Sequence, residues 1–222
     1  MFSYPWYKDP EHLIDPKTGS EIIFLSDSHL ELHHCKHAVH ETGSDGKLFC
    51  SNDRRWFHLR SNGLLTEVEH TFSPANSTPG HHCHNGKRGV IHPSMRHWGY
   101  QYCHVLVYQA WCGERHYPEK HIDHKNGNSL DYTPSNLEEV TPSENCWRSI
   151  HVLQVLRCKG IDPTTYSGPQ MDLWFALFRA YEMAGRKPIQ IPVEDLLRDY
   201  KHYHINPTFD KNDFDLTHHM EE

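Results

Sequence analysis

Long apolar runs are missing from this sequence of 222 residues, of which only 36% are hydrophobic. The longest run, LWFALF at 173–178, is far shorter than the ~20 apolar residues that a membrane-spanning helix needs. The N-terminal residues show neither the basic start and apolar stretch of a secretion signal nor the Arg-rich amphipathic pattern of an import signal. These absences predict a protein that has no membrane span and works in the cytoplasm.

Paired cysteines are also missing. The seven cysteines are an odd number at irregular spacing without a CxxC pair, which disfavours a disulfide framework and favours reduced thiols. Histidine, in contrast, is abundant, with 22 residues, and it clusters at 29–40 and at 81–92. Histidine and cysteine are the usual ligands of zinc, so either cluster could hold a structural Zn²⁺. Neither cluster shows a recognised zinc spacing, and polar loop residues are the favoured interpretation.

A surplus of positive charge is absent too, because the formal net charge is −7. The acidity lies at the ends: residues 1–33 carry two lysines against six acids, and residues 206–222 carry one lysine against five acids. The stretch 86–125 is different, with six Lys or Arg residues against three acids and aromatic residues between them. Such a stretch can contact DNA phosphates and bases, although an ordinary solvated surface has the same composition. The acidic tail could bind a protein partner.

Short runs rich in aromatic or β-branched residues, separated by Gly, Asn and Asp, predict strands and hairpins in the first third of the chain. These runs start at residues 21, 47, 55 and 63. Residues 73–89 have the composition of a long loop. A short strand at 99–103 and an amphipathic helix at 104–111 are expected to follow this loop.

The last third of the chain has a helical pattern. Thr141, Pro142 and Glu144 are the residue types of a capping box, so a helix should begin at Pro142. Apolar residues spaced three and four apart predict a second helix over 170–185. A third helix is expected to start at Pro192.

The stretch DHKNGNSLDYTPSNLEEVTPSEN, residues 123–145, has the pattern of two short strands around a tight NGN turn, followed by the capped helix. It resembles the HNH endonuclease motif of the ββα-metal, or His-Me finger, superfamily, especially that of phage-encoded homing enzymes. The preceding HVLVYQAWCG, residues 104–113, resembles the short helix that comes before the motif in those enzymes. The resemblance covers roughly residues 99–150, and its ordered set of positions makes it far more specific than a lone turn motif.

Two histidines, His121 and His124, could begin the motif. The family pattern places a glycine three residues after the catalytic histidine, and Gly127 satisfies this spacing only for His124. Asn136 and Asn145 then fall at positions where the family has asparagine. His121 is therefore expected to be structural or to face phosphate.

The resemblance implies a metal-dependent DNA endonuclease that hydrolyses phosphodiester bonds, with His124 and Asn136 as catalytic residues. An imidazole, with a reference pKa of ~6.5, can deprotonate a water molecule near neutral pH, which makes His124 the expected general base. Asn136 would hydrogen-bond the ring and fix its tautomer. Asp123 and Asn145 would bind one Mg²⁺ or Mn²⁺, since carboxylate and amide oxygens suit these cations.

Double-stranded DNA is the expected partner, bound in the minor groove by the hairpin and helix, while the flanking regions would supply any sequence preference. The candidate DNA-binding residues are Lys87, Arg88, Arg96, His104, Arg115 and Lys125. Two alternatives stay open: a low-specificity defence or toxin nuclease that acts with a partner, and a non-catalytic DNA-binding module.

The expected fold class is α+β, divided into three parts. Residues 1–95 would form a β-rich N-terminal region that could bind DNA, residues 96–158 the ββα-metal HNH core, and residues 159–222 a helical C-terminal extension with an acidic tail. The phage-type resemblance implies a bacterial host cell. The oligomeric state stays open.

Overall fold

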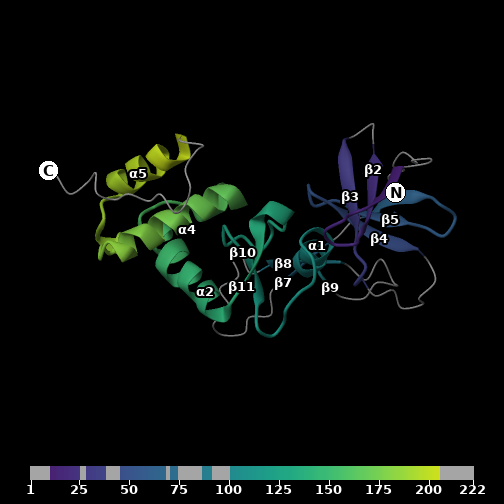
Figure 1. Ribbon diagram of the computed structural model, residues 1–222, viewed down its shortest axis with the longest axis horizontal. Helices are drawn as coiled ribbons and strands as arrows, with labels where there is room; N and C mark the ends of the chain where they lie inside the picture. The colour runs from purple at the N-terminus through teal and green to yellow at the C-terminus, as the bar shows by residue number, and fades with distance from the viewer. Residues whose placement is uncertain are drawn as a thin grey trace. The chain divides into compact units, whose positions relative to one another are not determined.

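The computed structural model describes residues 11–25, 29–38, 46–68, 71–74, 87–91 and 101–205 (Figure 1). It divides the chain into two compact units, which are described separately below. The first unit runs to His124 and resumes over Asn128–Glu139, and the second consists of Lys125–Gly127 and the residues from Val140 onward. The predicted α+β class is confirmed: the N-terminal region is rich in strands, and helices follow the hairpin of the motif. In the ranges given, no helix is both long enough and apolar enough to cross a membrane.

A six-stranded antiparallel sheet forms most of the N-terminal region, and each strand pairs with the next one along the chain. Its strands are β1 Glu11–Ile14, β2 Glu21–Leu25, β3 Leu30–His34, β4 Lys47–Ser51, β5 Trp56–Leu59 and β6 Leu65–Val68. Side chains alternate between the faces of a strand, and both Leu48 and its neighbour Phe49 are buried, so the two faces of the sheet are each covered. Phe49 packs with Ile23 and Leu32 in one cluster.

The other face of this sheet is covered by α1, Cys103–Trp111. Leu48 and Trp56 of the sheet pack with Leu106 and Val107 of this helix. The apolar spacing that predicted a helix at 104–111 therefore corresponds to the face that α1 buries. Four of the six strands were also predicted from the sequence, at 21, 47, 55 and 63.

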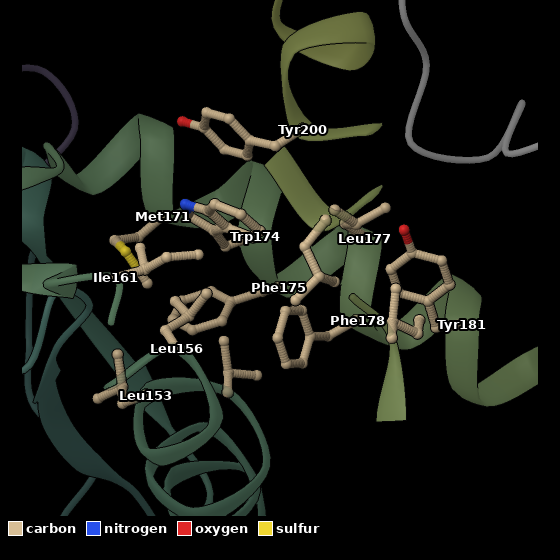
Figure 2. Packing of buried hydrophobic residues seen from close by; sticks show 13 residues of the cluster. Leu153, Leu156, Ile161, Met171, Trp174, Phe175, Leu177, Phe178, Tyr181 and Tyr200 are labelled. Carbon is tan, nitrogen blue, oxygen red and sulfur yellow. The ribbon is translucent and has the colours of Figure 1, made fainter. Parts of the chain in front are cut away.

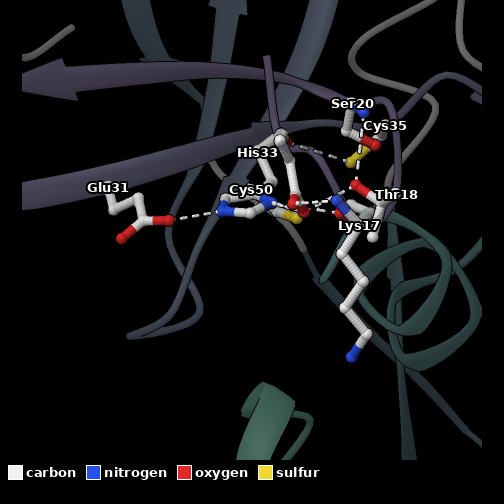
Figure 3. A network of polar contacts seen from close by, with 9 residues as sticks. Lys17, Thr18, Ser20, Glu31, His33, Cys35 and Cys50 are labelled. Carbon is white, nitrogen blue, oxygen red and sulfur yellow. Dashed lines mark hydrogen bonds and ion pairs between the residues drawn. The ribbon is translucent and has the colours of Figure 1, made fainter. Parts of the chain in front are cut away.

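The prediction of a polar loop for the first histidine cluster is wrong where the structure describes it, because β3 lies there and His33 is only 3% exposed. Its Nδ1 atom lies 3.1 Å from the backbone oxygen of Ala110, and its Nε2 atom lies 2.6 Å from Oε1 of Glu31 (Figure 3). The ring also stacks on Trp111, with the centroids 3.7 Å apart. Both ring nitrogens are thus engaged within the protein, where His33 links the sheet to the end of α1.

A second sheet contains β7 Thr71–Pro74, β8 Lys87–Ile91 and β9 Gln101–Tyr102, all antiparallel. The prediction of a loop over 73–89 is wrong at both ends of this range, because its first residues lie in β7 and its last in β8, where Pro74 pairs with Lys87. The residues between these strands lie outside the described residues. So does the predicted boundary at 95/96, and the three-part division of the chain stays a prediction.

The two predicted strands and the helix of the motif are present, but residues 125–136, and not a tight NGN turn alone, join the strands. Strands β10, His121–His124, and β11, Leu137–Val140, form a two-stranded sheet. The short 3₁₀ turn η3, Pro134–Asn136, leads into β11. Helix α2, Pro142–Trp147, follows β11 and continues without a break through the π-helical segment η4, Arg148–Leu153, into α3, Gln154–Cys158.

The second unit has its own apolar core, built on α4, Gly168–Met183, and α5, Val193–Ile205. Short 3₁₀ turns, η5 Pro163–Thr165 and η6 Pro188–Gln190, precede these two helices. Trp174 and Phe178 are fully buried at the centre of the core, and Trp174 stacks on Tyr200 of α5 with the centroids 4.2 Å apart (Figure 2). This core supports the helices that follow the motif and gives the C-terminal extension a packed interior of its own.

Candidate active site in the hairpin and the helix after it

Asp123 and His124 are the last two residues of β10, and both are half-buried. The Oδ2 atom of Asp123 and the Nε2 atom of His124 are shielded from solvent. The ring of His124 packs against the ring of His104, which lies in the first turn of α1; the centroids are 4.9 Å apart and the planes are tilted by 59°. The predicted general base thus has a histidine from α1 as its neighbour, and that contact was not predicted.

Asn136 is fully buried at the end of η3, one residue before β11. Its Nδ2 atom donates a hydrogen bond to the backbone oxygen of Asp131 at 2.7 Å. The carboxylate of Asp131 in turn accepts a hydrogen bond from the hydroxyl of Thr133 at 2.9 Å. Asn136 therefore fixes the loop between the two strands of the hairpin. The hydrogen bond expected between Asn136 and the ring of His124 stays a prediction.

The predicted start of the helix at Pro142 is confirmed. Thr141 caps α2 by accepting a hydrogen bond from the backbone N–H of Glu144 at 3.2 Å, and the backbone N–H of Asn145 donates to the backbone oxygen of Thr141 at 2.9 Å. The Glu144 carboxylate, expected to complete the capping box, binds Arg148 and Arg179. Asn145 thus lies near the start of a capped helix, in the second unit, whereas Asp123 belongs to the first.

The turn after His124 is held by the helical extension. The Nζ atom of Lys125 lies 2.8 Å from Oδ2 of Asp172 in α4. The Nδ2 atom of Asn126, which is 1% exposed, donates to the backbone oxygen of Tyr166 at 3.2 Å. Lys125 was predicted to contact DNA; its ammonium group is engaged in an ion pair in this structure, and its contact with DNA stays a prediction.

The other predicted DNA-binding residues lie in different places. Arg115 is exposed in the loop after α1, with its guanidinium group 4.3 Å from the ring centre of Tyr117. Lys87 and Arg88 lie on β8, and Arg96 lies outside the described residues. Among the members of this set whose side chains the structure describes, His104 packs against the ring of the predicted base.

Sequence reasoning missed Glu139 of β11, which holds the loop between α1 and β10. Its carboxylate accepts two hydrogen bonds from His116, one from the backbone N–H and one from the Nδ1 atom of the ring, the latter at 2.7 Å. Burial raises the pKa of Glu139, but these hydrogen bonds and the nearby charge of Lys120 outweigh it, so the pKa lies below its usual value. The local sequence LEEV gave no signal for this contact, because the partner of Glu139 lies 23 residues away.

A divalent cation would depend on few protein ligands here. Among the residues the structure describes, no group of three or more His, Cys, Asp or Glu side chains is placed to hold a metal. The metal ligands predicted from the sequence are not such a group: they are one carboxylate, Asp123, and one side-chain amide, Asn145. Two such oxygen ligands suit Mg²⁺ or Mn²⁺, which keep several of their water ligands when bound to proteins.

Comparison with known families decides what this segment is. Residues 101–146, about a fifth of the chain, match the profile of the HNH endonuclease family. This segment is an HNH endonuclease domain. The match contains α1, the hairpin and the start of α2, and an HNH domain is a nuclease domain that generally cleaves DNA with a divalent metal. Neither a curated protein nor a solved structure matches the chain. The resemblance to phage homing enzymes stays a prediction.

Proposed function

We propose that this chain is a metal-dependent DNA endonuclease in which His124 is the general base. The observation that carries the proposal is the HNH domain itself, in which His124 ends β10 beside Asp123 and packs against His104. In this proposal the imidazole of His124 takes a proton from a water molecule, and the resulting hydroxide attacks the phosphorus atom of the DNA backbone. An imidazole suits this role because its reference pKa is close to neutral pH.

Asn136 would support this base through the loop of the hairpin. Its amide nitrogen donates to the backbone oxygen of Asp131, and in this proposal its amide oxygen accepts a hydrogen bond from the ring of His124. Such a bond would leave the other ring nitrogen free of its proton, as a general base requires. Asn136 would then fix both the loop and the tautomer of the base.

Asp123 and Asn145 would hold one Mg²⁺ or Mn²⁺ through a carboxylate oxygen and an amide oxygen. When bound, the cation would stabilise the charge that develops on the phosphate and on the leaving 3′ oxygen. The cap by Thr141 supports this assignment, because it fixes the backbone of α2 around Asn145. A ligand on a capped helix is better defined in position than one on an open loop.

The substrate would be duplex DNA, approached from the minor groove, with any sequence preference supplied by the regions that flank the domain. A homing role in a phage-infected bacterial cytoplasm would require cleavage at one or few sites. A defence or toxin role would produce many cuts. Digestion of a long linear DNA followed by sequencing of the new ends separates these two roles.

A plasmid assay tests the proposal directly. Supercoiled plasmid is incubated with the protein and Mg²⁺ or Mn²⁺, with and without EDTA; we expect nicked or linear product only where free metal is present. His124→Ala should abolish this product, whereas His12→Ala, which removes an exposed histidine of β1, should not. Failure of the wild-type protein to cut, or full activity of His124→Ala, contradicts the assignment.

Metal binding can be measured without cleavage. Titration of the protein with Mn²⁺, followed by the electron paramagnetic resonance signal of the free ion, should show one site that weakens in Asp123→Ala and in Asn145→Ala. Glu119→Ala, which removes an exposed carboxylate from the loop before β10, is the matched control. Equal affinity in all three variants contradicts Asp123 and Asn145 as the ligands.

A further inference from the structure

We propose that His104 is a positioning residue of the active site, whose ring fixes the orientation of the His124 ring. The proposal rests on the proposed function to the extent that His124 is the base. The sequence led us to expect that His104 contacts DNA. In this proposal His104 acts instead through the side chain of His124.

The contact between the two rings is close. Their centroids lie 4.9 Å apart with a tilt of 59°, within the range in which aromatic rings attract each other. His104 comes from α1 and His124 from the end of β10, so the contact joins two different elements of the HNH domain. It is a tertiary contact between residues 20 positions apart in the sequence.

The backbone that carries His104 is well fixed. Cys103 before it and Val107 one turn after it are both completely buried, in the cluster that packs α1 against the N-terminal sheet. Burial also raises the pKa of the Cys103 thiol, which therefore stays protonated and apolar in this core. Because buried helix positions of this kind tolerate little movement, the first turn of α1 holds the backbone of His104 rigidly in place.

His104 also contacts a second aromatic ring. The ring of Tyr102, the residue just before α1, lies 5.7 Å from that of His104 with a tilt of 31°. Tyr102 is about half exposed, whereas His104 is half-buried. The three rings form a series from the surface to the predicted base, and His104 is the middle member.

A general base needs such support. The rotation of a histidine ring about its last side-chain bond is broad, so the strand that carries His124 does not by itself fix the ring nitrogens. A displacement of about 1 Å in a catalytic group can slow a reaction by about 100-fold. A neighbouring ring held by a buried helix removes much of this freedom. His104 is therefore expected to affect the rate of cleavage and not the affinity for DNA.

Two variants with a control test this inference. His104→Ala removes the ring, His104→Phe keeps a ring without nitrogen atoms, and Val105→Ala trims a neighbouring half-buried side chain of the same helix turn. Each protein is assayed for single-turnover cleavage of plasmid with Mg²⁺ and, separately, for DNA affinity in EDTA. We expect His104→Ala to slow cleavage about 10- to 100-fold at unchanged affinity. His104→Phe should recover most of this rate, and Val105→Ala should cleave like the wild type.

Other outcomes overturn the inference. If His104→Phe is as slow as His104→Ala, a ring nitrogen is needed and packing of the ring is not the reason. If His104→Ala loses DNA affinity in proportion to rate, the residue contacts DNA. If His104→Ala cleaves at the wild-type rate, or if Val105→Ala is as slow as His104→Ala, the contact does not position the base.

A spectroscopic readout keeps this test separate from that of the proposed function. In protein with ¹³C-labelled histidine, the ring signals of His124 should shift and broaden in His104→Ala, since a ring current is lost and the ring gains freedom. The signals should be less affected in His104→Phe. Unchanged His124 signals in His104→Ala overturn the inference even if the enzyme is active. A wild-type protein that cuts no DNA contradicts the proposed function, while the spectra still report on the contact.

Discussion

Lys125, the residue directly after the predicted base, forms an ion pair with Asp172 of α4, with Nζ and Oδ2 2.8 Å apart. Asn126 donates to the backbone of Tyr166, and Gly127 lies against Leu153. Three consecutive residues of the turn therefore belong to the second unit, whose core is built on the helices after the motif. The C-terminal extension thus supports the turn of the HNH hairpin.

Asp172→Asn should weaken this support. The side chain of Lys125 is only 13% exposed but that of Asp172 is 49% exposed, so solvent screens the pair and we expect a loss of about 0.5–1 kcal/mol of unfolding free energy. Cleavage should fall as well, because the turn begins one residue after His124. Asp195→Asn, which breaks the exposed pair of Asp195 with Arg198 on α5, is the control and should leave cleavage unchanged. Equal effects of the two substitutions on cleavage would argue against a special role for the turn.

Gly127→Ala should destabilise the protein more than Gly185→Ala, a change at a left-handed position with open space around it. Gly127 has φ +68°, and an added Cβ would lie 2.8 Å from Arg157 and 2.9 Å from the buried side chain of Leu153. Gly185 has φ +71° with open space around it, so Gly185→Ala measures the backbone strain alone, about 1–2 kcal/mol. Urea unfolding of both variants should show the larger loss for Gly127→Ala. A loss no larger than that of Gly185→Ala means that the turn can move away from the helix.

How much of this could be predicted from the sequence depends on the distance over which each contact acts. The hairpin and the start of α2 were predicted because their signals are local: the NGN turn, and Thr141 before Pro142. Strand β3 was missed because its residues, LELHH, are mostly polar or charged, and the burial of His33 depends on Trp111 and Ala110 far along the chain.

The candidate site divides in the same way. The positions of His124, Asn136 and Asn145 follow from spacing within one motif. The contact of His104 with His124 and the ion pair of Lys125 with Asp172 join residues 20 and 47 positions apart, and nothing in the local pattern indicates them. Sequence therefore predicts which residues form the motif, and packing determines which other residues hold them.

Asn136→Ala should lower both stability and activity. The side chain is fully buried and its amide nitrogen donates to the backbone oxygen of Asp131, so its removal leaves that oxygen without this partner, at a cost of about 1–3 kcal/mol. Asn136→Asp should be worse, because a carboxylate cannot donate this hydrogen bond and brings a charge into a buried place. Asn62→Ala, at an exposed turn where Oδ1 accepts from the backbone N–H of Leu64, is the matched control. Unfolding measurements that rank Asn136→Asp above Asn136→Ala in stability would contradict the role given to the amide nitrogen.

Glu139→Gln should change how stability depends on pH. The pKa of Glu139 in the folded protein lies below its usual value of 4.5, because burial, which raises it, is outweighed by the hydrogen bonds from His116 and by the charge of Lys120. A carboxyl group with a lowered pKa stabilises the folded state fully above its unfolded pKa, and this stabilisation is lost as the pH falls through the folded pKa. Glu139→Gln should therefore be less stable than the wild type at pH 7, and the difference should shrink as the pH falls below about 4.5.

Urea unfolding at a series of pH values measures this difference in stability, with Glu119→Gln, in the exposed part of the same loop, as the control. A difference that stays constant from neutral to acidic pH would show that the ionised carboxylate is not the group that holds the loop between α1 and β10.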